Sequence, residues 1–352
     1  MMNKLQKIEI NQYRGLKDMT LEKLSRINVL IGENNSGKTS ILEAIGLLTN
    51  PFSERVIRAI ADQRQRGMSS YGLAPAKERL RWLFPQKENE LQPIQLTMFL
   101  NNEKKTVIFK LLEEKVTSLP PLGEMIIESI TNEEVVDLYQ KIRVNINGQE
   151  EELNFSVLNE GVRPNEHQRL YRVGYISASE HKFFPASAEG IGQIILDEKE
   201  DELISLLQDF DNDINGIKLI PHKERNNIYI QKKGKELAPL FSFGDGLQKV
   251  LLIATAILKM QKGILLLDEP EVGIHTKMIP TYFKWLSKLS EQNNVTIFMA
   301  THSIEAVDGV LYADKESLEN LSFYRLEKER IKRFSGERMY SIRYDFGMEV
   351  RG

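Results

Sequence analysis

Hydrophobic and polar residues alternate at the start of the chain and then give way to short apolar runs. Ile8 and Ile10 alternate with polar neighbours, as in a half-buried strand, and residues 27–31 form a short apolar strand. Residues 40–48 carry apolar side chains at helical spacing, and the pair Asn50-Pro51 ends this helix. The first fifty residues therefore predict strands, a glycine-containing loop and a helix.

The middle of the chain predicts helices and antiparallel hairpins. Its turn residues, such as the pair Asn147-Gly148, are typical of tight connections between strands. The predicted hairpins span residues 93–112, which turn at 101–104, and residues 142–155 and 226–240. The predicted helical segments span residues 51–84, 124–136 and 197–213.

Beyond residue 241 the pattern changes to helix, apolar strand, helix, strand, which is typical of a parallel sheet with crossover helices. Two further strands, at 321–326 and 340–344, are predicted to pair with each other. We expect an α/β fold with a mixed or parallel sheet core flanked by helices, an antiparallel β subdomain and a helical insertion. The expected division of the chain is 1–50, 51–170 and 171–352.

The glycine loop, residues 32–39, matches the phosphate-binding pattern G-x-x-x-x-G-K-[ST]. It lies between a predicted strand and a predicted helix. Backbone N–H groups of such a loop surround the β-phosphate, Lys38 reaches the β- and γ-phosphates, and the Thr39 hydroxyl binds Mg²⁺. An ordinary glycine-rich turn is the alternative, and the flanking strand and helix argue against it. The predicted nucleotide-binding residues of this segment are Gly32, Asn34, Asn35, Ser36, Gly37, Lys38, Thr39 and Ser40.

Two adjacent carboxylates follow the apolar strand at 263–268. Asp268 ends the strand, where it would bind the metal ion together with Thr39. Glu269 comes next and would orient or deprotonate the attacking water. Asp-Glu-Pro after a strand is also a plausible turn, but the phosphate-binding loop favours the functional interpretation.

A second apolar strand, at 295–300, ends in Thr301-His302-Ser303. The imidazole of His302 would then lie at the same edge of the sheet and could bond the γ-phosphate or hold the water. A single histidine after a strand is more often a surface residue, so this assignment depends on its companions. The predicted catalytic residues are Lys38, Glu269 and His302.

Composition narrows the remaining possibilities. The 352 residues are 41% hydrophobic and 28% charged, which is enough to bury a large core. The net charge of -3 gives no general attraction for nucleic acid, so any such binding must come from a local patch. The absence of cysteine excludes disulfides, thiolate metal sites and cysteine nucleophiles, and fits a reducing compartment. With neither a long apolar run nor a signal-peptide core, we expect a cytoplasmic protein without a membrane segment.

The order of these motifs resembles that of ABC-class ATPase heads: a phosphate-binding loop, the element Ser242-Phe243-Gly244, then LLLDEPE and ATHS. The start NQYRGLKDMTLEKLSRINVLIGENNSGKTS is similar to the stand-alone branch that includes the RecF, SMC and OLD (overcoming lysogenization defect) ATPases. Short OLD-like chains without a TOPRIM nuclease domain are the most similar. The resemblance covers about residues 3–50 and 237–310.

The resemblance implies ATP and Mg²⁺ as cofactors and an active site shared between two subunits. Ser242 and Gly244 match the signature that contacts the γ-phosphate held by the opposite subunit, although the sequence departs from the usual L-S-G-G-Q. Residues 271–275 match the loop along the dimer seam. Arg14 would approach the nucleotide, and a surface arginine is the alternative. The glutamine that bridges metal and water in relatives has no obvious counterpart, and residues 177–179 stand where it is expected.

Two functions fit an ATPase of this kind. The resemblance implies an ATP-gated homodimeric sensor or scaffold in prokaryotic anti-phage defence, controlling a separately encoded nuclease or toxin. The alternative is a RecF-like DNA-binding ATPase in repair, which the low net charge disfavours because a DNA clamp needs several phosphate contacts. A non-hydrolysing switch would leave Glu269 unused. The sequence contains no Asn-Lys-x-Asp motif for guanine, which argues against a small GTPase.

Overall fold

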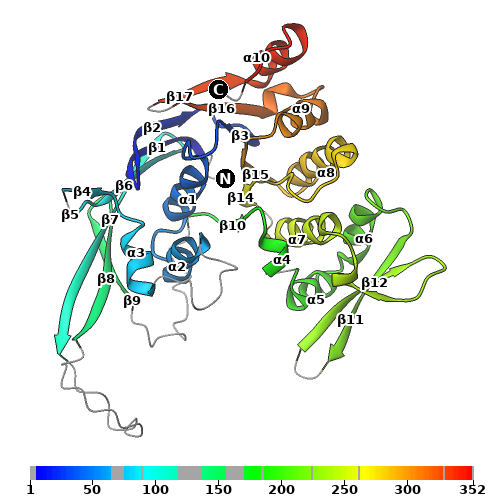
Figure 1. Cartoon of the computed structure of the whole chain (residues 1–352), viewed down its shortest axis with the longest axis horizontal. Coiled ribbons are helices and arrows are strands. Elements are labelled where there is room, and N and C mark those ends of the chain that lie inside the picture. The colour runs from blue at the N-terminus through cyan, green and yellow to red at the C-terminus, as the bar shows by residue number, and fades with distance from the viewer. Residues whose placement is uncertain are drawn as a thin grey trace, which may run out of the picture.

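A six-stranded sheet built from both halves of the chain forms the centre of the computed structural model (Figure 1). The structure describes residues 5–64, 75–88, 90–117, 136–155, 170–183, 186–222, 225–260, 262–327 and 330–350. Five strands of the central sheet are parallel, and the sixth, β17, is antiparallel to its neighbour. Their spatial order is β10 (Val173–Ile176), β14 (Gly263–Asp268), β15 (Val295–Thr301), β3 (Ile27–Ile31), β16 (Leu321–Glu327) and β17 (Arg330–Ser335).

Both faces of this sheet are buried, which explains why its strands read as continuous apolar runs. Successive residues face opposite sides, so that Val29 belongs to one hydrophobic cluster and Leu30 to the other. The first cluster packs against α7 (Asp245–Met260), α8 (Ile279–Gln292) and α9 (Ile304–Ala313). The second packs against α1 (Lys38–Thr49) and a second sheet.

The second sheet is antiparallel and lies beside α1 (Figure 1). Its order is β2 (Leu16–Glu22), β1 (Leu5–Tyr13), β6 (Ile94–Leu100), β7 (Glu103–Thr117), β8 (Val136–Ile146) and β9 (Gln149–Phe155). The two hairpins predicted here are confirmed, and Asn147 and Gly148 both have positive φ, as a two-residue primed turn requires. The connection between β7 and β8, where a helix was predicted at 124–136, lies outside the described residues apart from Val136, where β8 begins.

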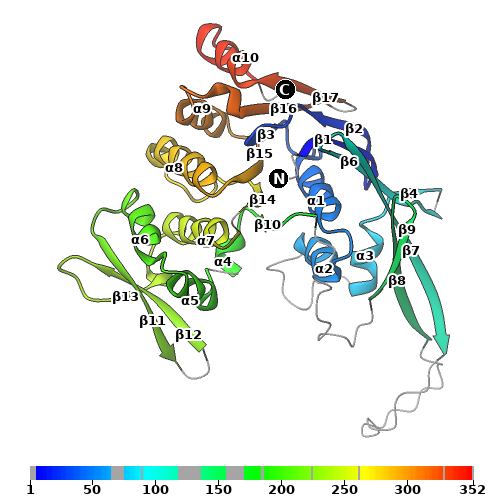
Figure 2. The same ribbon diagram turned by 180° about the vertical axis from the view of Figure 1, so that it is seen from behind.

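Smaller elements surround the two sheets, and Figure 2 shows β11 and β12 on the opposite side of the molecule from β7 and β8. The remaining strands are β4 (Gln86–Lys87), β5 (Glu90–Leu91), β11 (Ile214–His222), β12 (Arg225–Lys232) and β13 (Ala238–Pro239). The other helices are α2 (Glu54–Gln63), α3 (Ala76–Arg81), α4 (Glu180–Phe183), α5 (Ala188–Leu196), α6 (Glu200–Gln208) and α10 (Gly336–Tyr340). Single turns of other helical geometry occupy η3 (Leu240–Ser242), η4 (Thr276–Met278), η5 (Leu318–Asn320) and η6 (Ser341–Asp345).

Some sequence predictions for the second half of the chain were wrong. The strand predicted at 340–344 is helical, because Ser335 caps α10 through its side chain and Met339 is buried on that helix. In the structure β16 pairs antiparallel with β17 and parallel with β3. The helix predicted at 197–213 is present as the shorter α6. The hairpin predicted at 226–240 is confirmed by the pairing of β12 with β13, but β12 pairs over more residues with β11, a strand that was missed.

The predicted fold class is confirmed: a mixed, mainly parallel sheet lies between helices and an antiparallel β unit. The antiparallel sheet takes β1 and β2 from the first fifty residues and its other strands from the next segment. The division of the chain at residues 50 and 170 remains a prediction. Within the described ranges, no helix has both the length and the apolar character needed to cross a membrane.

Close packing of α8 against α9 gives a test of this fold. A Cβ atom added at Gly309 would lie 2.7 Å from the Phe283 ring and 2.8 Å from Ile279, closer than real contacts allow. We expect Gly309→Val to lower the free energy of unfolding by about 1–3 kcal/mol, because the buried ring must move. Denaturant unfolding measures this change. Gly15→Ala, where no heavy atom lies within 4 Å of the added Cβ, is the control; equal stability of the two variants would contradict this packing.

Candidate nucleotide-binding and catalytic site

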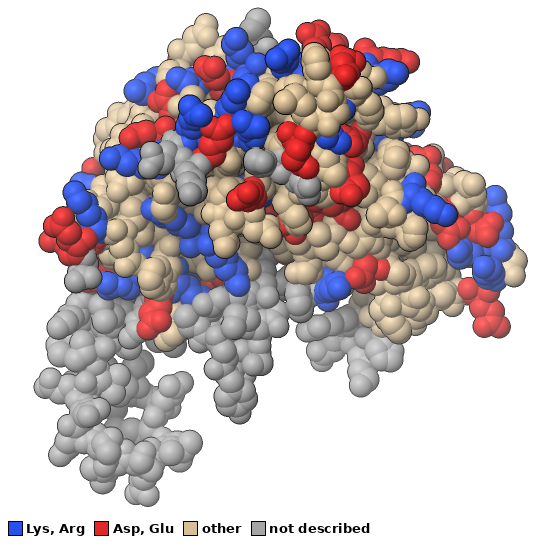
Figure 3. Space-filling model, turned by 45° about the horizontal axis from the view of Figure 1, so that its top comes forward, with Lys and Arg blue, Asp and Glu red and all other residues tan. Residues whose placement is uncertain are grey.

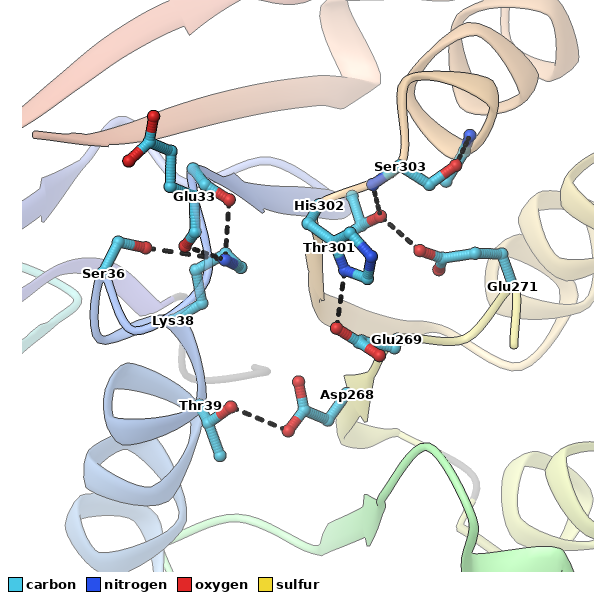
Figure 4. A network of polar contacts seen from close by, with 12 residues as sticks. Glu33, Ser36, Lys38, Thr39, Asp268, Glu269, Glu271, Thr301, His302 and Ser303 are labelled. Carbon is cyan, nitrogen blue, oxygen red and sulfur yellow. Dashed lines mark hydrogen bonds and ion pairs between the residues drawn. The ribbon is translucent and has the colours of Figure 1, made fainter. Parts of the chain in front are cut away.

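Three parallel strands bring the predicted site residues to one edge of the central sheet. Because β14, β15 and β3 are in register, Asp268 pairs with Ala300 and Thr301 pairs with Ile31. The segments that follow these strands carry the glycine loop, the carboxylates and His302, and they face one another in Figure 4. The expected convergence of three separate segments is therefore present in the folded chain.

The glycine loop turns sharply from β3 into α1, and the side chain of Lys38 folds back to bond the loop's own carbonyls. Gly37 has φ 99°, and a Cβ atom there would lie 2.8 Å from Leu16, so the loop requires glycine. The Lys38 ammonium donates to the carbonyls of Gly32 at 2.7 Å and Glu33 at 2.6 Å. Burial lowers the pKa of Lys38, and the nearby carboxylates of Glu269, Asp268 and Glu271 oppose this shift. Asn34 and Asn35 are exposed on the loop, and Ser36 is partly buried.

Thr39 and Asp268 are in direct contact across the site. The Thr39 hydroxyl donates to Asp268 Oδ2 at 2.9 Å, and the Tyr175 hydroxyl lies 3.4 Å from the same oxygen. Burial raises the pKa of Asp268, and the hydrogen bond from Thr39 acts in the opposite direction. Hydroxyl and carboxylate oxygens are the metal ligands that Mg²⁺ prefers, and Mg²⁺ sites beside phosphates typically use only one or two carboxylates. This pair fits that ion.

Glu269 and His302 form the second contact. His302 Nδ1 lies 2.6 Å from Glu269 Oε1 (Figure 4). Glu269 adopts φ 47°, a left-handed conformation that costs a residue with a side chain roughly 1 kcal/mol. Its N–H donates to the carbonyl of Ala300 at 2.9 Å. This backbone conformation directs the carboxylate toward the imidazole instead of along the line of the strand.

Glu271 continues this network into the loop after Glu269. The residue is 8% exposed, and its carboxylate accepts a 2.5 Å hydrogen bond from the Thr301 hydroxyl. The same hydroxyl accepts a bond from the N–H of Ser303, next to His302. Burial raises the pKa of Glu271. The two segments that carry Glu269 and His302 are thus joined by side chains as well as by the sheet.

The structure also brings Lys249 of α7 to this site, which the sequence interpretation missed. Its side chain is fully buried, and its ammonium donates to the carbonyls of Ala178, Glu269 and Val272. The sequence did offer one sign that Lys249 is buried. It directly precedes a long apolar helical segment, and it shares a helix face with Ile253 and Ile257. Tyr175 was missed because it looks like an ordinary strand residue.

Arg14 contacts the helix that follows the glycine loop. Its guanidinium lies 2.9 Å from Glu43, a fully buried carboxylate on α1, and donates to the carbonyl of Trp82 at 3.0 Å. Arg64 also pairs with Glu43 and donates to the Ser40 hydroxyl at 2.9 Å. In this geometry Arg14 supports α1, and its predicted contact with the nucleotide remains a prediction.

The predicted signature segment precedes α7. Ser242 is exposed in the turn η3 and donates its hydroxyl to the carbonyl of Pro239 at 2.7 Å. Gly244 stands just before α7, whose first residues pack against the loop after Glu271: a Cβ atom on Gly246 would lie 3.3 Å from the carbonyl of Gly273. Phe241, beside Ser242, is 81% exposed. The two segments that the resemblance assigns to a dimer seam are therefore in contact at the start of α7.

A family comparison supports this site. Residues 27–308, well over half of the chain, match the family described as "AAA domain, putative AbiEii toxin, Type IV TA system". The chain belongs to this family. As a member of this family, it is an ABC-class P-loop ATPase of the RecF-like branch, and it has the fold of the SMC heads.

Individual proteins similar to this AAA domain agree with that placement. An ATP/GTP phosphatase of Helicobacter pylori is 23% identical over 326 residues, which cover 86% of each chain. The RecF protein of Teredinibacter turnerae is 36% identical over 70 residues, 19% of this chain and 18% of that protein. A solved SMC head domain bound to the C-terminal domain of ScpA, derived from Pyrococcus furiosus, shares the fold with TM-score 0.51 at 10% identity, covering 99% of this chain and 100% of that one.

The partly buried carboxylate of Asp268 gives a prediction that needs neither nucleotide nor metal. Because burial raises its pKa, the folded state disfavours the charged form, and stability falls as pH rises from the ordinary value of 3.8 toward the raised one. We expect Asp268→Asn, with chelator present, to raise the thermal unfolding midpoint at pH 7 by roughly 1–3 °C.

The gain of Asp268→Asn should shrink as the pH is lowered toward that ordinary value, because the wild-type carboxyl is then protonated. Asp209→Asn, at an exposed position just after α6, is the control and should show no such pH-dependent gain. A lower midpoint for Asp268→Asn at pH 7 would contradict the burial of this charge.

Proposed function

We propose that this protein binds and hydrolyses ATP with Mg²⁺, in sites completed by a second copy of the chain. The proposal rests above all on the convergence of Lys38 and Thr39 from one segment with Asp268, Glu269 and His302 from two others. A structural role alone would not account for so many ionisable groups at one sheet edge. It is supported by the family and by the ATP/GTP phosphatase similar over most of both chains.

Each residue has a role that its position permits. Backbone N–H groups of the glycine loop and Lys38 would hold the phosphates, and Thr39 and Asp268 would hold Mg²⁺, which withdraws charge from the phosphate oxygens when bound. Glu269 would accept a proton from the attacking water. His302, 2.6 Å from Glu269, would orient that carboxylate and bond the terminal phosphate.

The second copy would supply Ser242 and Gly244. Both lie just before α7, whose N-terminus presents N–H groups to an anion, and the exposed Phe241 beside them would become buried on association. Association and ATP binding would then be linked, because the nucleotide lies between the two chains. In this arrangement residues 271–275 would lie along the seam.

For the cellular role, we propose an ATP-gated dimeric sensor or scaffold in a prokaryotic anti-phage defence system, controlling a separately encoded nuclease or toxin. The description of the family, which names a toxin and a toxin–antitoxin system, supports this role. This role can be tested by challenging two kinds of cells with phage: cells that carry this gene together with its neighbouring genes, and cells that carry it without them.

A RecF-like role in DNA repair is the alternative, favoured by the local similarity to RecF. On the face shown in Figure 3, basic and acidic side chains are interspersed, and the net charge is -3. A clamp that neutralises several DNA phosphates loses affinity steeply with salt. Filter binding to duplex DNA at two salt concentrations would distinguish these roles: tight, salt-sensitive binding with ATP would support repair.

Replacing the proposed general base gives the direct test of hydrolysis. We expect Glu269→Gln to bind ATP with unchanged affinity but to hydrolyse it about 10²–10⁴-fold more slowly, because the amide cannot accept the proton. The variant should accumulate as an ATP-bound dimer. Steady-state turnover, nucleotide titration and light scattering measure these three properties.

Two controls accompany this variant. Lys38→Ala should lose nucleotide binding, which separates a binding defect from a chemical one. Glu316→Gln changes an exposed glutamate away from the site and should hydrolyse ATP at the parental rate. If Glu269→Gln also turned over at that rate, another group would have to serve as the base.

A further inference from the structure

The ammonium of Lys249 is fully matched by acceptors. A lysine ammonium has three N–H donors, and here the three accepting carbonyls lie at 2.8 Å (Val272), 2.9 Å (Glu269) and 3.2 Å (Ala178). They belong to two separate loops: Ala178 follows β10, whereas Glu269 and Val272 lie in the loop after β14. Lys249 therefore fastens both loops to the second turn of α7.

Burying the charged ammonium of Lys249 in this arrangement costs free energy of folding. Lys249 is completely buried, and its helical neighbours Val250, Leu251 and Ile253 are apolar core residues. Burial lowers the pKa of Lys249 to about 8, with the carboxylates of Glu271 and Glu269 opposing that shift, so the group is still mostly charged at neutral pH. An apolar residue would avoid the cost of burying a charge, but it would leave the three carbonyls without this donor.

One of these bonds ends on the residue whose conformation matters most for chemistry. Glu269 is held in its left-handed conformation from both sides: its N–H donates to Ala300, and its carbonyl accepts from Lys249 and from the N–H of Val272. The direction of its side chain toward His302 follows from that backbone conformation. Without Lys249, the carbonyl of Glu269 would be held by the N–H of Val272 alone.

The other end of the connection is the signature segment. Gly244 precedes Lys249 by five residues, roughly 7 Å along a helix axis, and α7 is a continuous helix from Asp245 to Met260. The same turns of α7 contact the loop at Gly273. Lys249 therefore links the first turns of α7 directly to the carbonyl of Glu269, beside the contact at Gly273.

We infer that Lys249 is a positioning residue for Glu269, which couples the engagement of Ser242 and Gly244 with the partner's nucleotide to the placement of Glu269 in the same chain. This inference rests on the proposed function, because it assigns to Lys249 a role in the proposed hydrolysis. Lys249 acts through the loop and does not contact the nucleotide.

The test compares Lys249→Met with wild type for ATP-analogue affinity, KM and kcat. Affinity and KM should change little, since Lys38 and the glycine loop are intact. The rate constant kcat should fall about 10²-fold, as is typical when a catalytic group is misplaced by about 1 Å. Lys259→Met, at an exposed lysine on the same helix, is the matched control and should keep the parental kcat.

A double-mutant cycle separates positioning from a general structural role. In the Glu269→Gln background, Lys249→Met should cause no further loss of kcat, because it acts only through Glu269. An equal fractional loss in both backgrounds, or an unchanged kcat in the single variant, would overturn the inference. If Lys249→Met does not fold, Lys249→Gln keeps two donors and is measured in the same two backgrounds.

These outcomes differ from those that defeat the proposed function. If wild type hydrolyses ATP and Glu269→Gln is slow while Lys249→Met matches wild type, the positioning role fails and the ATPase assignment stands. If Glu269→Gln itself turns over at the parental rate, the assignment of the base fails, and with it the role of Lys249.

Discussion

The register of three parallel strands is the constraint on which the site depends. Since β3, β14 and β15 end at the same edge of the sheet, the segments after them meet, although Lys38 and Glu269 are more than two hundred residues apart in sequence. The apolar residues of these strands are buried on both faces, so a slip of one strand would move side chains into the wrong cluster. The same burial that stabilises the fold therefore fixes the geometry of the site.

That geometry concentrates charge. Asp268, Glu269 and Glu271 lie within four consecutive positions, and the buried lysines Lys38 and Lys249 approach them from different elements. Burial raises the pKa of Asp268 and Glu271 and lowers that of both lysines. The site therefore disfavours the charged form of each group relative to water. Such opposed shifts are typical of sites that bind or transform charged ligands. In the proposed dimer, the nucleotide phosphates would add further negative charge beside Lys38.

The motifs of this site and the convergence of the segments that carry them could be predicted from the sequence, whereas side-chain contacts with backbone carbonyls could not. The glycine loop and the strand before Asp268 have strong patterns, because each combines an apolar run with residues that only a sharp turn tolerates. The partners of Lys249 are three backbone carbonyls, which leave no trace in the sequence. Strand β11 was missed for a related reason, because its register with β12 depends on tertiary pairing. The helical segment after Ser335 was missed because it depends on capping and burial.

The central claim is that each active site is shared by two chains. Mixing two variants, each inactive alone, tests it directly: Lys38→Ala supplies an intact signature segment, and Ser242→Arg supplies an intact glycine loop. In a mixed dimer one site has both intact parts, so ATP hydrolysis should return when the two proteins are combined, toward half the wild-type rate per mixed dimer. If the mixture stays as inactive as its components while mixed dimers demonstrably form, the shared site is contradicted.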